Sequence, residues 1–365
     1  MLQSSAVRRA GIGAAAALVP AALACRFALV YRARTGHPRR HEPLWSPADL
    51  GLRYEDVVVA TGDGLGLPAW FLPAGPGPAP GVGLVHGWES SRDRMLPHAQ
   101  FLHAAGFHVL AVDVRGHGRN GPEALPVTAG EFAADAAAAA RWLASRPEVA
   151  EIGLLGHSMG AIGVLVAGAA EPRVRAVVSV AAPADPYRLT RQTFRLASLP
   201  IPGLLAWPLA WLTTRVVLRP RGHTVSAVSA SRAVRAVAAP VLLVHGDADR
   251  VVPVGHLARL AGIRRAARPD AVTESLVVPG GEHSWLFASA DFRAAVARFL
   301  AASLGGPLDP DAAARSAAAE HVARLPEPER LTVLDEEPGG LRSLLRLFRH
   351  QAPTRPNPPS QEARP

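Results

Sequence analysis

Residues 152–162 read Ile-Gly-Leu-Leu-Gly-His-Ser-Met-Gly-Ala-Ile: an apolar run, a Gly-His-Ser-Met-Gly pentapeptide and a second apolar run. The first run predicts a buried strand and the second a helix, so Ser158 falls on the turn between them. Gly156 and Gly160 are small enough for a sharp turn, which lifts the serine hydroxyl out at the carboxyl edge of a sheet. The helix start also offers N–H groups and a dipole that favour a developing anion. This stretch therefore predicts Ser158 as a nucleophile.

On both sides of this stretch, short apolar runs alternate with longer helical patterns. A Gly/Asp turn within residues 54–72 predicts a β-hairpin before the alternation begins. Strands that are separated by helices connect through right-handed crossovers and form a mostly parallel sheet. We therefore predict an α/β fold with helices on both faces of the sheet. The expected strands are residues 81–86, 107–113, 152–156, 174–181, 241–245 and 274–278, and the expected helices follow Met159 and lie at 95–105, 129–145, 255–267 and 290–303.

A nucleophilic serine needs a general base, and the base needs an acid that fixes its tautomer. His283 follows the strand at 274–278, and both Asp247 and Asp249 follow the strand at 241–245. The carboxyl ends of parallel strands meet at one edge of the sheet, where Ser158 also emerges. We predict His283 as the base and Asp249 as the acid, because Asp249 stands in the loop before the next helix. Asp247 is the alternative acid, although its position nearer the strand suits a role in the turn.

Acyl transfer places negative charge on an oxygen, which backbone N–H groups can stabilise. One predicted donor is the N–H of Met159, the residue after the nucleophile. The second is the N–H of Trp88, which follows His86-Gly87 at the end of the strand at 81–86. The Trp88 indole is also a candidate wall of the substrate pocket, with simple packing as the alternative.

The chain resembles the α/β-hydrolase superfamily and, within it, the serine aminopeptidase S33 or monoacylglycerol-lipase-like group. The resemblance covers about residues 54–303 and implies the order nucleophile, acid, histidine, without specifying the substrate. Esterases, lipases, thioesterases, peptidases and acyltransferases share this pattern. It also implies that Asp113 and Arg115 support a tight loop. The matching motifs are Leu84-Val-His-Gly, Asp113-Val-Arg-Gly-His-Gly, the pentapeptide at 156–160, Pro240-Val-Leu-Leu-Val-His-Gly-Asp-Ala-Asp-Arg-Val-Val-Pro and Gly281-Glu-His.

The interval at residues 184–239 is longer than a plain crossover needs, and members of such families carry a cap there. It holds the apolar run 199–212, with Trp207 and Trp211, and many arginines, but no acidic residue between Asp185 and Asp247. An apolar run of this kind packs over a site or touches lipid. We predict a helical cap in which Trp207 and Trp211 contribute to an apolar pocket.

The amino-acid composition limits which other classes of function the chain can have. The chain has 365 residues, 49% of them apolar, which is enough for a large core, and its +9 charge comes from arginine. It has neither zinc-finger spacing nor a basic stretch interleaved with aromatic residues, so we expect no nucleic-acid partner. A single cysteine, Cys25, excludes an intrachain disulfide. No metal and no cofactor is expected.

The two ends differ from the middle of the chain. Residues 1–42 carry Arg8 and Arg9, a long apolar stretch interrupted by Arg26, and a basic linker, which together predict an uncleaved membrane anchor. The alternative is an export signal that is cleaved. Arginines flank the stretch on both sides, so its orientation stays open. Residues 43–304 are predicted as the catalytic domain, and 305–365, rich in Pro and charge, as a largely disordered tail.

These patterns together predict a serine hydrolase that is associated with a membrane. The expected substrate is a small-molecule or lipid-like carboxylic ester, cleaved through an acyl-enzyme. Peptidase, aminopeptidase and acyltransferase activity with the same three residues are the enzymatic alternatives. A scaffold of this fold that binds without catalysis is the alternative outside the enzymes.

Overall fold

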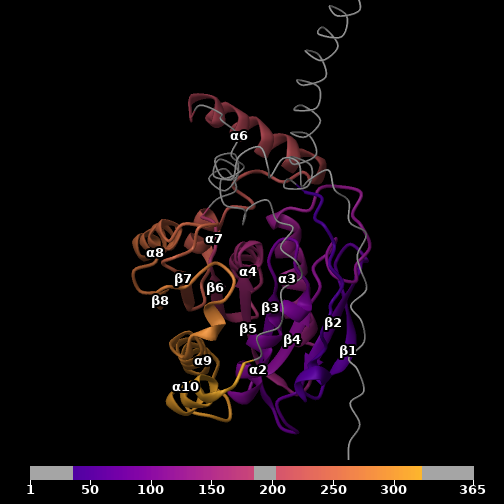
Figure 1. The fold of residues 1–365 in the computed structure, drawn as a ribbon, viewed down its shortest axis with the longest axis vertical. Helices are drawn as coiled ribbons and strands as arrows, with labels where there is room; N and C mark the ends of the chain where they lie inside the picture. Colours follow the sequence, from indigo (N-terminus) through magenta and orange to yellow (C-terminus); the bar gives the residue numbers. More distant parts are fainter. Residues whose placement is uncertain (1–35, 185–202, 323–365) are drawn as a thin grey trace, which may run out of the picture.

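The computed structural model describes residues 36–184 and 203–322 (Figure 1). An eight-stranded sheet in the order β1-β2-β4-β3-β5-β6-β7-β8 forms its centre. The β1–β2 and β2–β4 pairs are antiparallel, and every pair from β4 to β8 is parallel. The predicted α/β fold with a mostly parallel sheet is confirmed. The strands are Glu55–Ala60 (β1), Gly66–Leu72 (β2), Ala79–Val85 (β3), His108–Val112 (β4), Val149–His157 (β5), Val174–Val180 (β6), Val241–Gly246 (β7) and Thr273–Val278 (β8).

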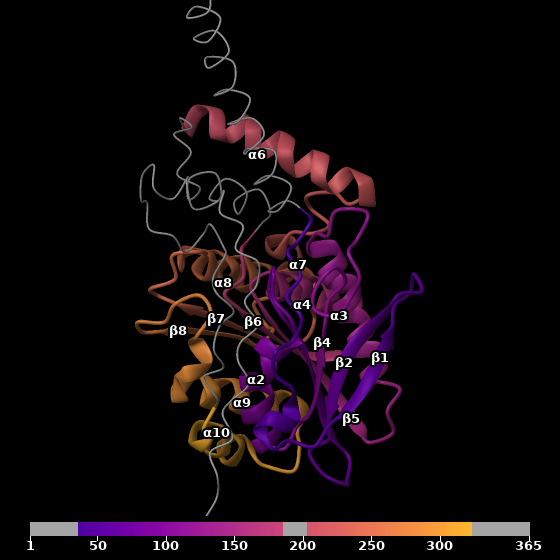
Figure 2. The same cartoon turned by 45° about the vertical axis from the view of Figure 1, so that its right-hand side comes forward.

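Helices cover both faces of the sheet (Figures 1 and 2). One apolar cluster unites α3, α4, α7 and α8 with one face, and a second unites α2, α9 and α10 with the other. The α-helices are Leu96–Ala104 (α2), Ala129–Leu143 (α3), Met159–Ala170 (α4), Gly203–Leu218 (α6), Ala230–Ala236 (α7), Gly255–Ala267 (α8), Ala290–Leu304 (α9) and Pro310–Ala319 (α10). Short 3₁₀ helices are Pro47–Leu50 (η1), Arg92–Met95 (η2), Arg219–Arg221 (η3) and Leu286–Ala288 (η4).

Strand β4 illustrates why the strands read as continuous apolar runs. All five of its residues are buried. Leu110 and Val112 belong to one cluster, whereas Val109 and Ala111 belong to the other. Side chains alternate between the two faces of a strand, so a sheet covered on both faces needs apolar residues at every position.

The described part of the predicted cap holds α6, η3 and α7, of which α7 packs into the layered body against α4 and α8. Helix α6 lies above the layered body in the view of Figure 2, and its last residue, Leu218, is buried in the apolar cluster of α3 and α4. It is joined to the body through η3, where Arg221 donates to the carbonyl oxygens of Leu125 and Pro126 and pairs with Glu123. Residues 185–202 of the interval lie outside the described residues.

The folded body extends beyond both predicted boundaries, residues 43 and 304. Before residue 43, the carbonyl oxygen of Gly36 accepts the N–H of Val127 at 2.6 Å, and Arg40 donates to the carbonyl oxygen of Asn120. After residue 304, Asp309 caps α10 by accepting the N–H groups of Asp311 and Ala312.

Helix α10 belongs to the core rather than to a disordered tail, because Ala313, Ala314 and Ala317 are buried and it packs on α9 and α2. Asp309-Pro310 followed by alanines is a helix start signal, which the overall Pro and charge content of the tail obscured. The rest of the tail, residues 323–365, lies outside the described residues.

The predicted membrane anchor falls in residues 1–35, which lie outside the described residues. Among the helices at 36–184 and 203–322, none is long and apolar enough to cross a membrane. The anchor therefore stays a prediction.

Candidate active site

Ser158 occupies a strained turn between β5 and α4. Its φ of 54° and ψ of −112° lie in a region that non-glycine residues rarely adopt, at a cost of about 1–3 kcal/mol. A side chain at Gly156 would collide with the carbonyl group of Gly160, and one at Gly160 would collide with the carbonyl oxygens of Val85 and His86. The strand, turn and helix expected around Ser158 are thus present, and the close packing explains both glycines.

The loops after β7 and β8 bring the two predicted partners to Ser158. Nε2 of His283 lies 3.0 Å from Oγ of Ser158, and Nδ1 of His283 lies 2.7 Å from Oδ2 of Asp249. The other candidate acid, Asp247, instead accepts the N–H of Gly280 at 2.7 Å. A hydroxyl, an imidazole and a carboxylate in this sequence of hydrogen bonds can activate a serine for attack on a carbonyl carbon.

The Asp249 carboxylate is buried and accepts several hydrogen bonds. Its Oδ1 accepts the N–H groups of Val251 and Val252, both at 2.8 Å. Burial acts to raise the pKa of Asp249, but hydrogen bonds from His245 and His283 outweigh it and hold that pKa well below its usual range. The carboxylate is therefore ionised throughout the pH range in which a histidine imidazole can take up a proton.

The two predicted oxyanion donors, the N–H groups of Met159 and Trp88, stay predictions, and the structure describes their surroundings. Met159 is the first residue of α4, and N–H groups in the first turn have no partner within the helix. Gly87 lies beside Ser158, since a Cβ on Gly87 would be 3.3 Å from Cβ of Ser158. Trp88 follows Gly87 directly in the chain.

His86 orients that loop, a role the sequence reading did not assign. It is fully buried, and its Nδ1 donates to the carbonyl oxygen of Gly87 at 2.8 Å while its Nε2 accepts the N–H of Val114. C=O and N–H of a trans peptide point in opposite directions, so the N–H of Trp88 points away from His86. Burial lowers the pKa of His86 to about 4, which keeps the ring neutral.

His157, the residue before Ser158, was also missed. Its Nε2 donates to the carbonyl oxygen of His283 at 2.7 Å, and the two rings lie 4.9 Å apart. Burial and the neighbouring His283 lower the pKa of His157 to about 4. A neutral His157 thus ties the loop of His283 to the turn of Ser158. The only signal available was its position inside the pentapeptide.

The three predicted pocket residues differ in position. The Trp88 ring is partly buried against His117, and its Nε1 finds no hydrogen-bond partner among the described residues. Trp211 on α6 is 52% exposed and stacks against the Arg215 guanidinium, 3.9 Å from the ring centroid, so it faces outward. The side chain of Trp207 lies outside what the structure describes.

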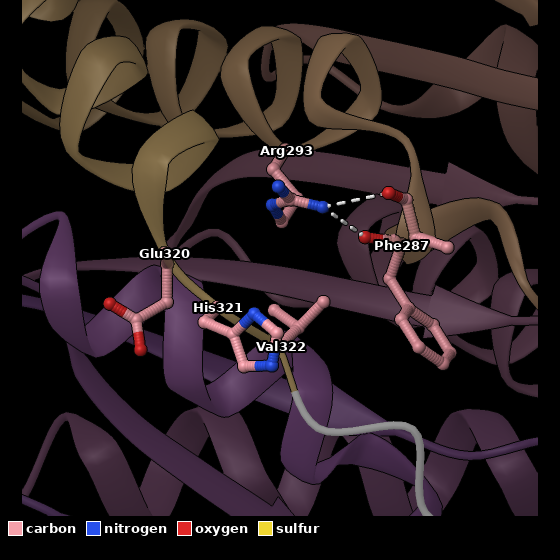
Figure 3. Close-up of a pocket in the computed structure, with 6 residues that line it drawn as sticks. Phe287, Arg293, Glu320, His321 and Val322 are labelled. Atoms are coloured by element: carbon pink, nitrogen blue, oxygen red, sulfur yellow. Dashed lines mark hydrogen bonds between the residues drawn. The ribbon is translucent and has the colours of Figure 1, made fainter.

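A separate cavity of about 180 Å³ lies where α10 ends (Figure 3). Arg293, one of the charged residues that line the cavity, donates hydrogen bonds to the carbonyl oxygens of Phe287, Ala288, Ala317 and Ala318. Arg293 therefore joins α10 to η4 and is not free to bind a ligand. None of the residues that line this cavity belongs to the site at Ser158.

Within the described ranges, no group of three or more His, Cys, Asp and Glu side chains is placed to hold a metal ion.

Solved structures share this architecture. The esterase Pf2001 of Pyrococcus furiosus superposes with a TM-score of 0.61 and 24% identity, covering 74% of this chain and 98% of the esterase. A further crystal form of the same esterase gives 26% identity and a TM-score of 0.57, covering 73% of this chain and all of the esterase. Est1E of Butyrivibrio proteoclasticus, solved with ferulic acid, is 20% identical at a TM-score of 0.50 and covers 62% of this chain and 91% of that one. The fold is that of the α/β-hydrolases and is related to esterases.

Sequence comparisons narrow the class to a family. A family model described as serine aminopeptidase, S33, matches residues 78–230. The uncharacterized protein Rv2307c of Mycobacterium tuberculosis is 32% identical over 232 residues, which cover 63% of this chain and 72% of that protein. Human protein ABHD12B is 27% identical over 231 residues, 59% of each chain. This chain is an α/β-hydrolase with a serine aminopeptidase S33 domain at residues 78–230, as its motifs predicted, and it is homologous to Rv2307c and ABHD12B.

Proposed function

We propose that this protein is a serine hydrolase that cleaves carboxylic esters through an acyl-enzyme. The observation that carries the proposal is the hydrogen-bond chain from Oγ of Ser158 through His283 to Asp249, with 3.0 Å and 2.7 Å between its partners. A strained backbone held in place by close packing is typical of functional sites, and Ser158 has such a backbone.

The proposed reaction has two halves. Oγ of Ser158 attacks the ester carbonyl carbon while Nε2 of His283 takes its proton, and the N–H groups of Trp88 and Met159 bind the resulting oxyanion. The intermediate expels the alcohol, which receives the proton from His283, and leaves an acyl-serine. Water then gives a proton to His283 and attacks the acyl carbon, and the second tetrahedral intermediate collapses as His283 returns that proton to Oγ of Ser158, which releases the acid and restores the free serine. Asp249 orients His283 and stabilises its protonated form throughout.

An ester substrate is supported by the related folds, which include esterases, whereas the family description supports an aminopeptidase as second candidate. The two differ in the leaving group, so the purified chain should be tested on p-nitrophenyl acyl esters and on aminoacyl p-nitroanilides. We expect turnover of the esters that Ser158→Ala abolishes. Faster turnover of the aminoacyl anilides would favour the peptidase, and no turnover of either class would favour the scaffold that binds without catalysis.

The exposed surface of helix α6 supports the proposal of an apolar substrate. Trp211, Leu212 and Val216 are each more than half exposed on it, and its neighbours include Arg215 and Arg219. Such an apolar and basic surface, exposed on the described part of the predicted cap, fits a lipid-like ester and an anionic interface.

Substrate chain length provides the test of that preference. Each buried methylene contributes about 0.8 kcal/mol, close to fourfold in binding, so kcat/KM should rise from acetyl to medium-chain p-nitrophenyl esters. Trp211→Ser should weaken this dependence. Val272→Ser is the matched control, because Val272 is equally exposed but stands before the first residue of β8, away from the carboxyl ends of the strands. If kcat/KM of the unaltered protein does not change with chain length, the proposed preference for a lipid-like substrate is wrong.

Membrane association is part of the same proposal. The predicted anchor joins the fold at Gly36, which is hydrogen-bonded to Val127, while Arg221, shortly after α6, binds the carbonyl oxygen of the adjacent Pro126. An anchor that leaves the fold there would place α6 and the site on the side that faces the bilayer.

A further inference from the structure

The inference concerns His245, which no motif assigned to the site. It stands near the end of β7, and 1% of its side chain is exposed. Its Nε2 lies 2.6 Å from the carbonyl oxygen of Val252 and 3.2 Å from Oδ2 of Asp249. A carbonyl oxygen can only accept, so Nε2 carries a proton, and this one N–H faces both oxygens.

His245 completes the set of donors around the carboxylate of Asp249. The N–H groups of Val251 and Val252 hold Oδ1, while Nδ1 of His283 and Nε2 of His245 hold Oδ2. Rotation of the carboxylate would break contacts on both oxygens. The same imidazole ties the carbonyl of Val252 to β7 and thereby closes the loop that carries Asp249.

We propose that His245 is a positioning residue of the active site: its Nε2–H fixes Oδ2 of Asp249 against Nδ1 of His283 and takes up part of the negative charge of that oxygen. The proposal rests on the proposed function, in which Asp249 and His283 serve Ser158. It assigns His245 no contact with substrate.

The charge sharing has a measurable consequence. A hydrogen bond to a carboxylate withdraws charge from it, so removing the N–H of His245 leaves more charge on Oδ2 for His283. More negative charge beside an imidazole favours its protonated form. The acidic limb of the pH profile of kcat/KM should then move to higher pH.

The other ionisable groups near His283 do not account for the expected shift of the acidic limb, which depends on the contact between His283 and Asp249. His157 is kept neutral by burial, with its pKa lowered to about 4, and Asp247 is engaged by the N–H of Gly280. Glu282 precedes His283 in the chain and is present in every variant compared. Among these ionisable groups, only the side chain at position 245 differs between the variants.

The experiment compares His245→Leu with His245→Gln in the full chain, measuring kcat and KM on a soluble ester between pH 5 and 9. The glutamine amide can place an N–H near the position of Nε2, so His245→Gln should keep the profile of the unaltered protein. His245→Leu should move the acidic limb upward by about half a pH unit, the size of effect a weak hydrogen bond produces, and lower kcat severalfold without raising KM. His98→Leu, which removes a buried imidazole from α2, is the control and should leave the limb in place.

An unmoved acidic limb in a folded His245→Leu protein would overturn the proposal and leave His245 as an anchor for Val252 alone. If His245→Leu does not fold, His245→Asn takes its place, because its shorter amide does not reach Oδ2. An asparagine variant that matches His245→Gln would equally overturn the proposal. Failure of the proposed function itself is distinguishable, because the unaltered protein would then show no hydrolysis that depends on Ser158.

Discussion

At the scale of single residues, histidines hold the parts of the site in place. His86 binds the carbonyl oxygen of Gly87, and His157 binds that of His283. Both rings are neutral, because burial lowers each pKa to about 4. Neutral donors position the backbone without repelling the positive charge that His283 takes up during the proposed reaction. The side chain that must change its charge is thus surrounded by side chains that do not.

The carboxylate of Asp249 permits a direct test at this scale. Asp249→Asn keeps the shape of the side chain but turns an acceptor into a possible donor toward Nδ1 of His283, which favours the wrong tautomer. We expect kcat on an ester to fall by about 10⁴-fold, as in other proteins with this arrangement. Asp247→Asn is the matched control, because Asp247 binds the N–H of Gly280, and it should cost far less. If Asp247→Asn lowers kcat more than Asp249→Asn does, Asp247 rather than Asp249 is the acid that orients His283.

At the scale of elements, the position of Ser158 depends on how closely α4 approaches the sheet. Gly160 lies in the first turn of α4, against the carbonyl oxygens of Val85 and His86 at the end of β3. Gly262 lies inside α8, is exposed, and has no atom within 4 Å of a Cβ built on it. Two glycines in helices thus have opposite surroundings.

Alanine at each glycine should separate the two effects. Gly160→Ala forces β3 and α4 apart and should lower the free energy of unfolding by about 1–3 kcal/mol or more, as overpacked cores do. Gly262→Ala should raise it by up to about 1 kcal/mol, because alanine is the better helix former. Urea denaturation measures both. A neutral Gly160→Ala would mean that the turn at Ser158 does not depend on this close approach.

The strands and most of the helices could be predicted because apolar runs mark them locally, and Ser158, Asp249 and His283, which the structure brings together, each follow such a run. Helix α10 was missed, since its short start signal at Asp309 stands within a segment whose overall composition resembles a disordered tail. The role of His245 was not predictable either. It depends on a loop folding back so that Val252 and Asp249 both face one nitrogen, a relation that only the folded chain contains.

At the scale of the whole molecule, the cap and the first described residues meet. Arg221 binds the carbonyl oxygens of Leu125 and Pro126, and Gly36 packs against Pro126. The layered body with its two apolar clusters lies below them (Figure 2). The proposed anchor therefore joins the body beside the cap rather than at the far end of α9 and α10.

The anchor can be tested by removing it. The full chain should fractionate with membranes, and a shortened chain beginning at Gly36 should be soluble, with unchanged kcat/KM on a soluble ester, because every residue of the site lies later in the chain. A shortened chain beginning after Arg40 is the control for the boundary and should be less stable, since it loses the hydrogen bonds of Gly36 and Arg40. A full-length, uncleaved protein found only in the soluble fraction would contradict the anchor.

The central claim is that Ser158 is a nucleophile activated by His283, and covalent labelling tests it most directly. A fluorophosphonate reacts with an activated serine and remains attached to it, so mass spectrometry of the intact chain and of its peptides locates the modified residue. The account predicts one added group, at Ser158, with no labelling of Ser158→Ala and strongly slowed labelling of His283→Ala. Labelling at another serine, or a Ser158→Ala protein that still reacts and turns over esters, would contradict it.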